Sequence, residues 1–84
     1  MHQKNMDELV RTFRQQKTDT DLRNFLKALL TPAELDEIPT RLQIVKLLKQ
    51  GMPQKEIAKK LGVGIATVTR GSKELQKGHF SEVD

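Results

Sequence analysis

The side chains with the clearest chemical use lie in the stretch Gln54–Leu75, which combines hydroxyl, amide and cationic groups at helical spacing. A helix that begins near Ile65 turns by about 100° per residue, which places short side chains at the start of its outer face and cations toward its end. That outer face carries Ala66, Thr67, Arg70, Lys73, Glu74 and Lys77, whereas Ile65, Val68, Ser72 and Leu75 share the opposite side. Short and hydrogen-bonding groups suit base edges in the DNA major groove, and cations suit phosphates. The pattern therefore predicts a helix that is presented to DNA.

A second helix is predicted immediately upstream. It has one apolar face, which is expected to pack against the rest of the protein, and one polar face. Its apolar positions are Ile57, Ala58 and Leu61, and its polar positions are Lys55, Glu56, Lys59 and Lys60. Gly62 follows where a helix end needs a left-handed residue, and Val63 then fills the turn. Ala58, Gly62 and Val68 have the spacing of a helix-turn-helix motif. The alternative is an ordinary pair of packed helices with a solvated charged face.

The positive charge of the chain is concentrated on this motif. Of the net charge of +4, residues 1–48 hold 8 Lys and Arg against 7 Asp and Glu, residues 49–77 hold 7 against 2, and residues 78–84 hold 0 against 2. Such clustering is the pattern expected for a polyanionic partner, since phosphate neutralisation releases counterions. We therefore count Lys59, Arg70 and Lys73 among the predicted DNA contacts. A charge run alone would be weak support, because most are simply solvated.

Length and composition limit what the rest of the chain does. Eighty-four residues make one domain, whose own core would be marginal and which a dimer would stabilise. Without cysteine there is neither a disulfide framework nor a thiolate metal site, and no residues have the spacing of a catalytic or metal-binding cluster. No apolar run approaches the roughly 20 residues of a membrane span. We expect a non-enzymatic, metal-free, soluble protein of the cytoplasm.

Two further helices are predicted at the front of the chain. The first, within residues 3–17, has one apolar stripe of Met6, Leu9, Val10 and Phe13. Residues 18–21 interrupt it with side chains that cap helices. The second has a dense stripe of Leu22, Phe25, Leu26, Leu29 and Leu30. These two stripes are candidates for a subunit interface, with an ordinary intrachain core as the equal alternative.

A third helix is predicted to begin at Pro32, because Thr31 is a good N-cap and Glu34 completes a capping box. Its predicted apolar stripe is Leu35, Ile38, Leu42, Val45 and Leu48. Pro39 lies inside this helix and removes one backbone hydrogen bond, so we expect a kink or a break. Gly51 ends the segment.

The predicted organisation is a single all-α domain over residues 1–84. Residues 1–51 form the helical core and dimerisation region, residues 54–76 the helix-turn-helix, and residues 77–84 a short tail that is too polar for another helix.

Four segments together resemble the bacterial tryptophan repressor family. They are LLTPAEL (29–35), TRLQIVKLL (40–48), MPQKEI (52–57) and GIATVTRGS (64–72), and the last is the most specific. The resemblance covers roughly residues 29–75. It implies an intertwined all-helical homodimer that binds a double-stranded DNA operator and uses L-tryptophan as a corepressor. In this family the second helix of the motif is known to lie in the DNA major groove, and its base contacts are known to be largely water-mediated.

The resemblance also assigns site residues. Arg41 and Arg70 would flank the indole ring, with one guanidinium meeting the carboxylate, and guanidinium groups suit both tasks. Leu30, Thr31 and Gly71 match other positions of the ligand pocket, partly through the second subunit. Gln54, Lys55, Ile65, Ala66, Thr67 and Thr69 match positions that face the operator. Without the family, Arg41 would be a surface residue and Arg70 a phosphate contact.

Three features depart from the best-known members of the family. Glu74 stands where those members have Ser beside the ligand's amino group, and its carboxylate either pairs with the ammonium or closes the pocket to tryptophan. Pro39 replaces a flexible residue. The chain also ends soon after Leu75, where those members add a further helix, so it is either cut or a shorter variant.

The primary hypothesis is a corepressor-controlled transcriptional repressor. The alternatives are a family paralogue that is ligand-independent or answers another metabolite, a DNA-targeting fragment of a recombinase or transposase, and a structural dimerisation module.

Overall fold

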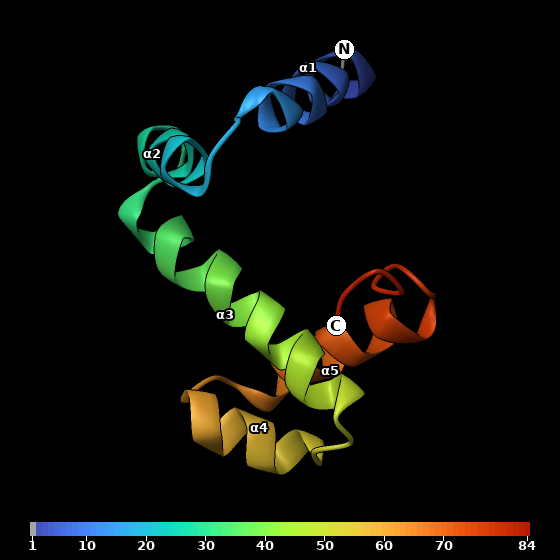
Figure 1. Ribbon diagram of the computed structural model, residues 1–84. Coiled ribbons are helices and arrows are strands. Elements are labelled where there is room, and N and C mark those ends of the chain that lie inside the picture. The colour runs from blue at the N-terminus through green and yellow to red at the C-terminus, as the bar shows by residue number, and fades with distance from the viewer. Residues whose placement is uncertain (1) are drawn as a thin grey trace. The chain divides into compact units, whose positions relative to one another are not determined.

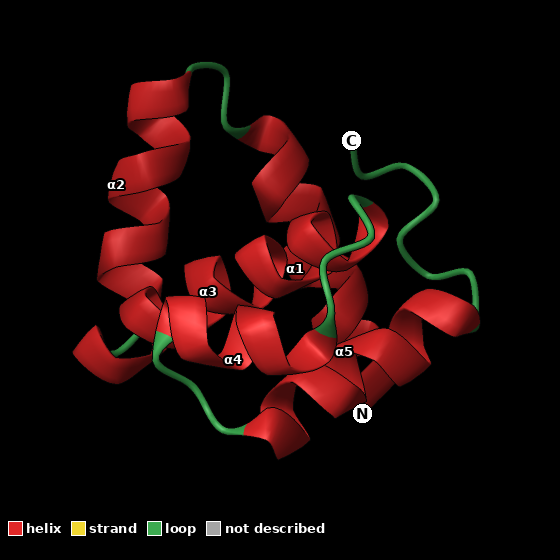
Figure 2. Cartoon of the chain, turned by 90° about the horizontal axis from the view of Figure 1, so that it is seen from below, coloured by secondary structure: helices red, strands yellow, loops and turns green. Residues whose placement is uncertain are grey.

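The computed structural model describes residues 2–84, and every element of that part is helical (Figures 1 and 2). The helices are α1 (His2–Gln15), α2 (Asp19–Leu29), α3 (Pro32–Lys49), α4 (Gln54–Leu61) and α5 (Ile65–Gln76). The all-α prediction is confirmed. None of these helices is both long and apolar enough to cross a membrane. The chain divides into two compact units, residues 1–35 and 36–84, which are described separately.

The first unit holds α1 and α2, whose apolar stripes lack a full intrachain core. The rings of Phe13 and Phe25 meet edge to face, with centroids 5.5 Å apart. Beyond this contact Met6 is 56% exposed, Val10 49% and Leu29 51%. Helix α1 ends at Gln15, two residues before the predicted limit, and Thr18 caps α2 by accepting a hydrogen bond from the Asp21 N–H at 3.0 Å. The two predicted stripes are present on these helices, but none of their residues is fully buried.

The predicted capping box is present at the start of α3. The Glu34 N–H donates to Thr31 Oγ1 at 3.2 Å, and the Thr31 N–H donates to Glu34 Oε1 at 2.9 Å. The hydrogen bonds from the Thr31 backbone and side chain lower the pKa of Glu34. Because the folded-state pKa is depressed, this contribution to stability is present above the ordinary glutamate pKa and is lost as pH falls through the lowered value.

We expect Glu34→Gln to lower the thermal midpoint near neutral pH and to have little effect in acid. Glutamine can still accept the Thr31 N–H hydrogen bond, but it carries no charge to favour the helix start. Once Glu34 is protonated, wild type and variant become equivalent at this site. Thermal unfolding followed by circular dichroism at pH 7 and in acid measures the difference. A gap in midpoint that stays constant with pH would contradict this account.

The sequence predicts a kink or a break at Pro39. Helix α3 continues through this residue, so there is no break, and the kink stays a prediction. Proline fixes φ at a helical value and removes only one N–H donor, which leaves the flanking hydrogen bonds able to continue the helix. On the C-terminal side the helix is held by the buried side chains of Ile44 and Leu47. Packing of this second half outweighs the loss of one backbone hydrogen bond.

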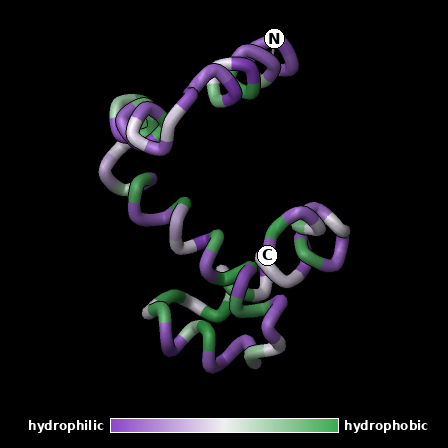
Figure 3. The backbone as a smooth tube through the Cα atoms, in the orientation of Figure 1, coloured by the Kyte–Doolittle hydropathy of each residue, from purple (hydrophilic) through white to green (hydrophobic). Residues whose placement is uncertain are grey.

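The core of the second unit lies where α3 meets the α4–α5 pair, and apolar segments of all three helices converge there (Figure 3). Its buried members are Ile44, Leu47, Ile57 and Val68, with Leu48, Met52, Ala58, Leu61 and Val63 packed against them. The predicted stripe of α3 is wrong in part, because Ile38 and Leu42 are exposed while Ile44 and Leu47 are buried. Helix α3 is apolar on more than one face, and α4 and α5 cover the face that carries Ile44.

The turn between α4 and α5 has the expected geometry. Gly62 has φ +68° and its N–H donates to the Ala58 carbonyl, while the Val63 N–H donates to the same carbonyl at 3.0 Å. Residues with a side chain rarely adopt that φ, which explains the glycine. Val63 then packs against the core, and α5 begins two residues later. This turn fixes the direction in which α5 leaves the core.

Candidate functional site

The face predicted to meet DNA is exposed along most of α4 and α5. Exposed positions are Lys55, Lys59, Ile65, Ala66, Thr67, Arg70 and Lys73, whereas Gln54 and Thr69 are partly buried. Short side chains therefore surround the start of α5, and cations lie on α4 and farther along α5. An exposed helix of this composition, fixed by a buried apolar partner face, can meet base edges with its first turns and phosphates with its cations.

Gln54 and Thr69 bond to each other across the two helices. The Thr69 hydroxyl lies 2.8 Å from Gln54 Oε1, to which it donates, and 3.0 Å from the Ile65 carbonyl. This pair connects the first residue of α4 to the middle of α5. Both residues were predicted to face the operator, and the structure adds that they connect the two helices by a hydrogen bond.

Ile65 does not belong to the buried side of α5, contrary to the periodicity-based prediction. Its side chain is 48% exposed, whereas Val68 is fully buried. Side chains of a helix lean toward the preceding turn, and Ile65 is the first residue of α5, so it has no earlier turn of that helix to cover. Exposure agrees with the position that the family resemblance gave it.

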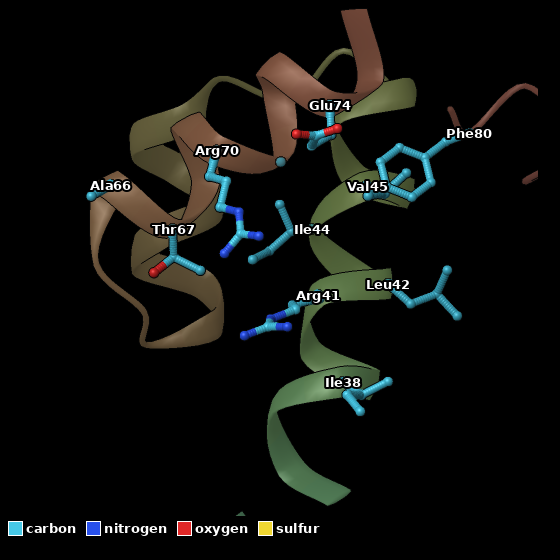
Figure 4. Close-up of a pocket in the computed structure, with 11 residues that line it drawn as sticks. Ile38, Arg41, Leu42, Ile44, Val45, Ala66, Thr67, Arg70, Glu74 and Phe80 are labelled. Atoms are coloured by element: carbon cyan, nitrogen blue, oxygen red, sulfur yellow. The ribbon is translucent and has the colours of Figure 1, made fainter. Parts of the chain in front are cut away.

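A cavity of about 540 Å³ lies beside this face, between α3, α5 and the C-terminal tail (Figure 4). Its lining residues are Ile38, Arg41, Leu42, Ile44, Val45, Ala66, Thr67, Arg70, Gly71, Glu74 and Phe80. The volume lies in the range of small-molecule sites, and the lining is mostly apolar with a few charged groups, as such sites usually are. The structure thus brings together four of the predicted ligand residues, namely Arg41, Arg70, Gly71 and Glu74.

The charged groups of the cavity complement a zwitterion. The side chains of Arg41 and Arg70 extend toward the same side, from α3 and α5 respectively (Figure 4). Glu74 lies one turn beyond Arg70 on α5 and supplies a carboxylate to the same lining. Guanidinium groups bind a carboxylate, and a carboxylate binds an ammonium group. Glu74 also contacts Lys77 Nζ at 3.2 Å and His79 Nε2 at 3.7 Å, so a ligand ammonium would share it.

Gly71 marks the close approach of α5 to α3. A Cβ atom at this position would lie 3.0 Å from Ile44 Cγ2 and 3.7 Å from Leu48 Cδ1. A side chain at this position would require the buried Ile44 side chain, or α5 itself, to shift by a few tenths of an ångström. The glycine is therefore explained by helix packing as well as by its place in the lining.

The remaining predicted ligand residues, Leu30 and Thr31, lie in the first unit. The Leu30 N–H donates to the Leu26 carbonyl at 2.9 Å, and Thr31 caps α3. Conversely, sequence reasoning did not place Ile38, Val45 or Phe80 in a binding site. The first two belonged to a predicted core stripe, and Phe80 is a lone aromatic residue in a polar tail.

Two packed helices, a left-handed glycine turn and an exposed second helix define a helix-turn-helix protein. The chain belongs to the Trp repressor family, whose model, described as "Trp repressor protein", matches residues 4–82. This confirms the resemblance inferred from the four sequence segments.

Curated relatives support the same membership, and each is described as a "Trp operon repressor homolog". A protein of Vibrio campbellii is 35% identical over 82 residues, which cover 96% of this chain and 82% of the relative. One of Actinobacillus succinogenes is 42% identical over 77 residues, covering 87% and 76%. One of Vibrio parahaemolyticus is 45% identical over 60 residues, so the aligned part spans 58% of that relative's length. No solved structure matches the chain significantly.

Proposed function

We propose that this protein is a cytoplasmic transcriptional repressor that binds a double-stranded DNA operator under the control of a small corepressor, L-tryptophan. The observation that carries the proposal is the place of Arg70, which lies on the exposed face of α5 and also lines the cavity. A ligand held by this side chain changes the geometry and charge of the helix that meets DNA. Membership of a repressor family supports regulation rather than catalysis, and it favours a repressor over a recombinase fragment.

We further propose that the working form is a homodimer. The apolar stripes of the first unit leave Met6, Val10 and Leu29 about half exposed. A monomer of this size gains little stability from so few buried side chains. A second copy that covers these stripes supplies the missing core, and a two-fold symmetric protein fits a two-fold symmetric operator.

Binding of L-tryptophan provides the direct test, because the chain contains no Trp and no Tyr. Added tryptophan is then the only strong fluorophore, and we expect its emission to shift to shorter wavelength as the ring leaves water. The same ligand should increase the affinity for operator DNA in a gel-shift assay, and the protein should sediment as a dimer. An emission spectrum that does not change at millimolar tryptophan would contradict the corepressor assignment.

Glu74 favours a second candidate function, that of a DNA-binding paralogue that is controlled by another metabolite or by no ligand. The Glu74 carboxylate lies 3.2 Å from Lys77 Nζ and 3.7 Å from His79 Nε2, so a ligand ammonium must compete with these two groups for it. This competition favours a ligand that does not depend on an ammonium group. Sequence-specific DNA binding that tryptophan does not alter would support this candidate. Binding without sequence preference that disappears with modest added salt would instead contradict both repressor proposals.

A further inference from the structure

The tail that follows α5 folds back onto the second unit. The Gly78 N–H donates to the Leu75 carbonyl at 3.0 Å, and the next residues continue in turns. This reversal returns Phe80 to the cavity, which it lines together with Val45 of α3 (Figure 4). Phe80 and Val83 are partly buried, whereas the residues around them are exposed. The tail therefore has an inner, apolar side and an outer, polar side.

Lys49, the last residue of α3, anchors this tail. Its ammonium group donates hydrogen bonds to the Phe80 carbonyl, at 2.9 Å, and to the Val83 carbonyl. The Val83 N–H in turn donates to the Phe80 carbonyl at 3.1 Å. The Lys49 ammonium group thus binds two backbone carbonyls, those of Phe80 and Val83, at the two ends of one turn. Charge-assisted hydrogen bonds of this kind are stronger than neutral ones, so they favour the folded-back tail.

Glu74 lies close to two residues at the start of the tail. Its two carboxylate oxygens lie near Lys77 Nζ and His79 Nε2, which flank the point where the chain reverses. The segment that carries Phe80 is therefore held to α3 by the Lys49 hydrogen bonds, and its start lies close to Glu74 of α5. These two helices are the ones that form the rest of the cavity.

We propose that the tail, residues 77–84, is a wall of the ligand site, with Phe80 as a specificity-determining residue and Lys49 as its positioning residue. This inference rests on the proposed function, since it concerns the same cavity. Phe80 does not fill the cavity, because about 540 Å³ remains open with the ring in place. The ring instead extends the apolar surface of Ile38, Leu42 and Val45, opposite the two guanidinium groups. The site then takes an amino acid with a large apolar side chain and disfavours small or polar ones.

Fluorescence titration with L-tryptophan tests this role in the full chain. Phe80→Ala removes apolar contact area and is expected to raise the dissociation constant about tenfold. Phe80→Leu keeps an apolar wall and should recover part of the loss. Lys49→Gln should weaken binding in the same direction, and Lys49→Arg, which keeps a charged donor, should restore it. Lys60→Gln removes one exposed lysine from α4 and serves as the charge-matched control.

Trypsin adds a readout of the anchor that needs no ligand. Cleavage after Lys77 should be faster in Lys49→Gln than in wild type or Lys60→Gln, because the released tail is open to the protease. If wild type binds tryptophan and Phe80→Ala binds it equally well, the wall is overturned while the proposed function stands. If wild type itself fails to bind tryptophan, the proposed corepressor and this inference fall together. Equal cleavage in all variants would overturn the role of Lys49.

Discussion

Ile57→Ala is expected to lower the free energy of unfolding by about 3 kcal/mol, a typical cost for truncating a fully buried isoleucine. Ile57 has no exposed surface and packs in the core with Ile44, Leu47 and Val68. Its removal leaves a space at the junction of three helices, and the surrounding structure relaxes only partly into such a space. Small domains have only about 5–15 kcal/mol of total stability, so this loss is a large share.

Ile65→Ala is the matched control, because it removes the same atoms from an exposed position of the neighbouring helix. We expect this variant to retain stability within about 0.5 kcal/mol of wild type, as is usual for surface substitutions. Urea unfolding followed by circular dichroism compares the three proteins at one fixed protein concentration, since a dimer's stability depends on concentration. Similar losses in both variants would mean that α4 does not pack as described.

The helix starts and stops were predictable because they depend on local chemistry. Thr31 and Glu34 form the capping box that their spacing predicts, and Gly62 adopts the left-handed conformation that the helix end requires. Helix-turn-helix spacing likewise placed Ala58 and Val68 against the core. In these cases the residues that determine the structure are close in sequence, so the sequence pattern is enough to predict it.

The other features depend on contacts between distant residues. Helix α3 is apolar on several faces, so periodicity could not choose Ile44 over Ile38, and only the docking of α4 and α5 decides it. Arg41 and Phe80 line the same cavity although they are far apart in the sequence. No residue near Phe80 in the sequence indicates that it belongs to a binding site. Arg41 and Arg70 lie on different helices, so periodicity within one helix could not predict that they share a site. Only the family resemblance predicted it.

Arg70→Ala is expected to weaken both tryptophan binding and operator binding. In the cavity the guanidinium supplies charged hydrogen bonds to a carboxylate, and loss of such bonds is expected to raise the dissociation constant about 10- to 100-fold. On the exposed face of α5 the same group is available to a phosphate, so the variant should also show a shallower dependence of DNA affinity on salt. Tryptophan fluorescence and gel shifts at several salt concentrations measure the two effects.

Two single-cation variants separate these roles. Arg41→Ala removes a cavity guanidinium from α3, outside the helix-turn-helix, and should weaken tryptophan binding while leaving ligand-free DNA binding intact. Lys73→Ala removes an exposed cation of α5 that does not line the cavity, and should weaken DNA binding alone. Thr67 is a poorer control than its exposure suggests, because it also lines the cavity. Of the three cations Arg41, Arg70 and Lys73, Arg70 alone both lines the cavity and lies on the exposed face of α5. Unchanged ligand affinity in Arg70→Ala would therefore remove the proposed link between corepressor and DNA.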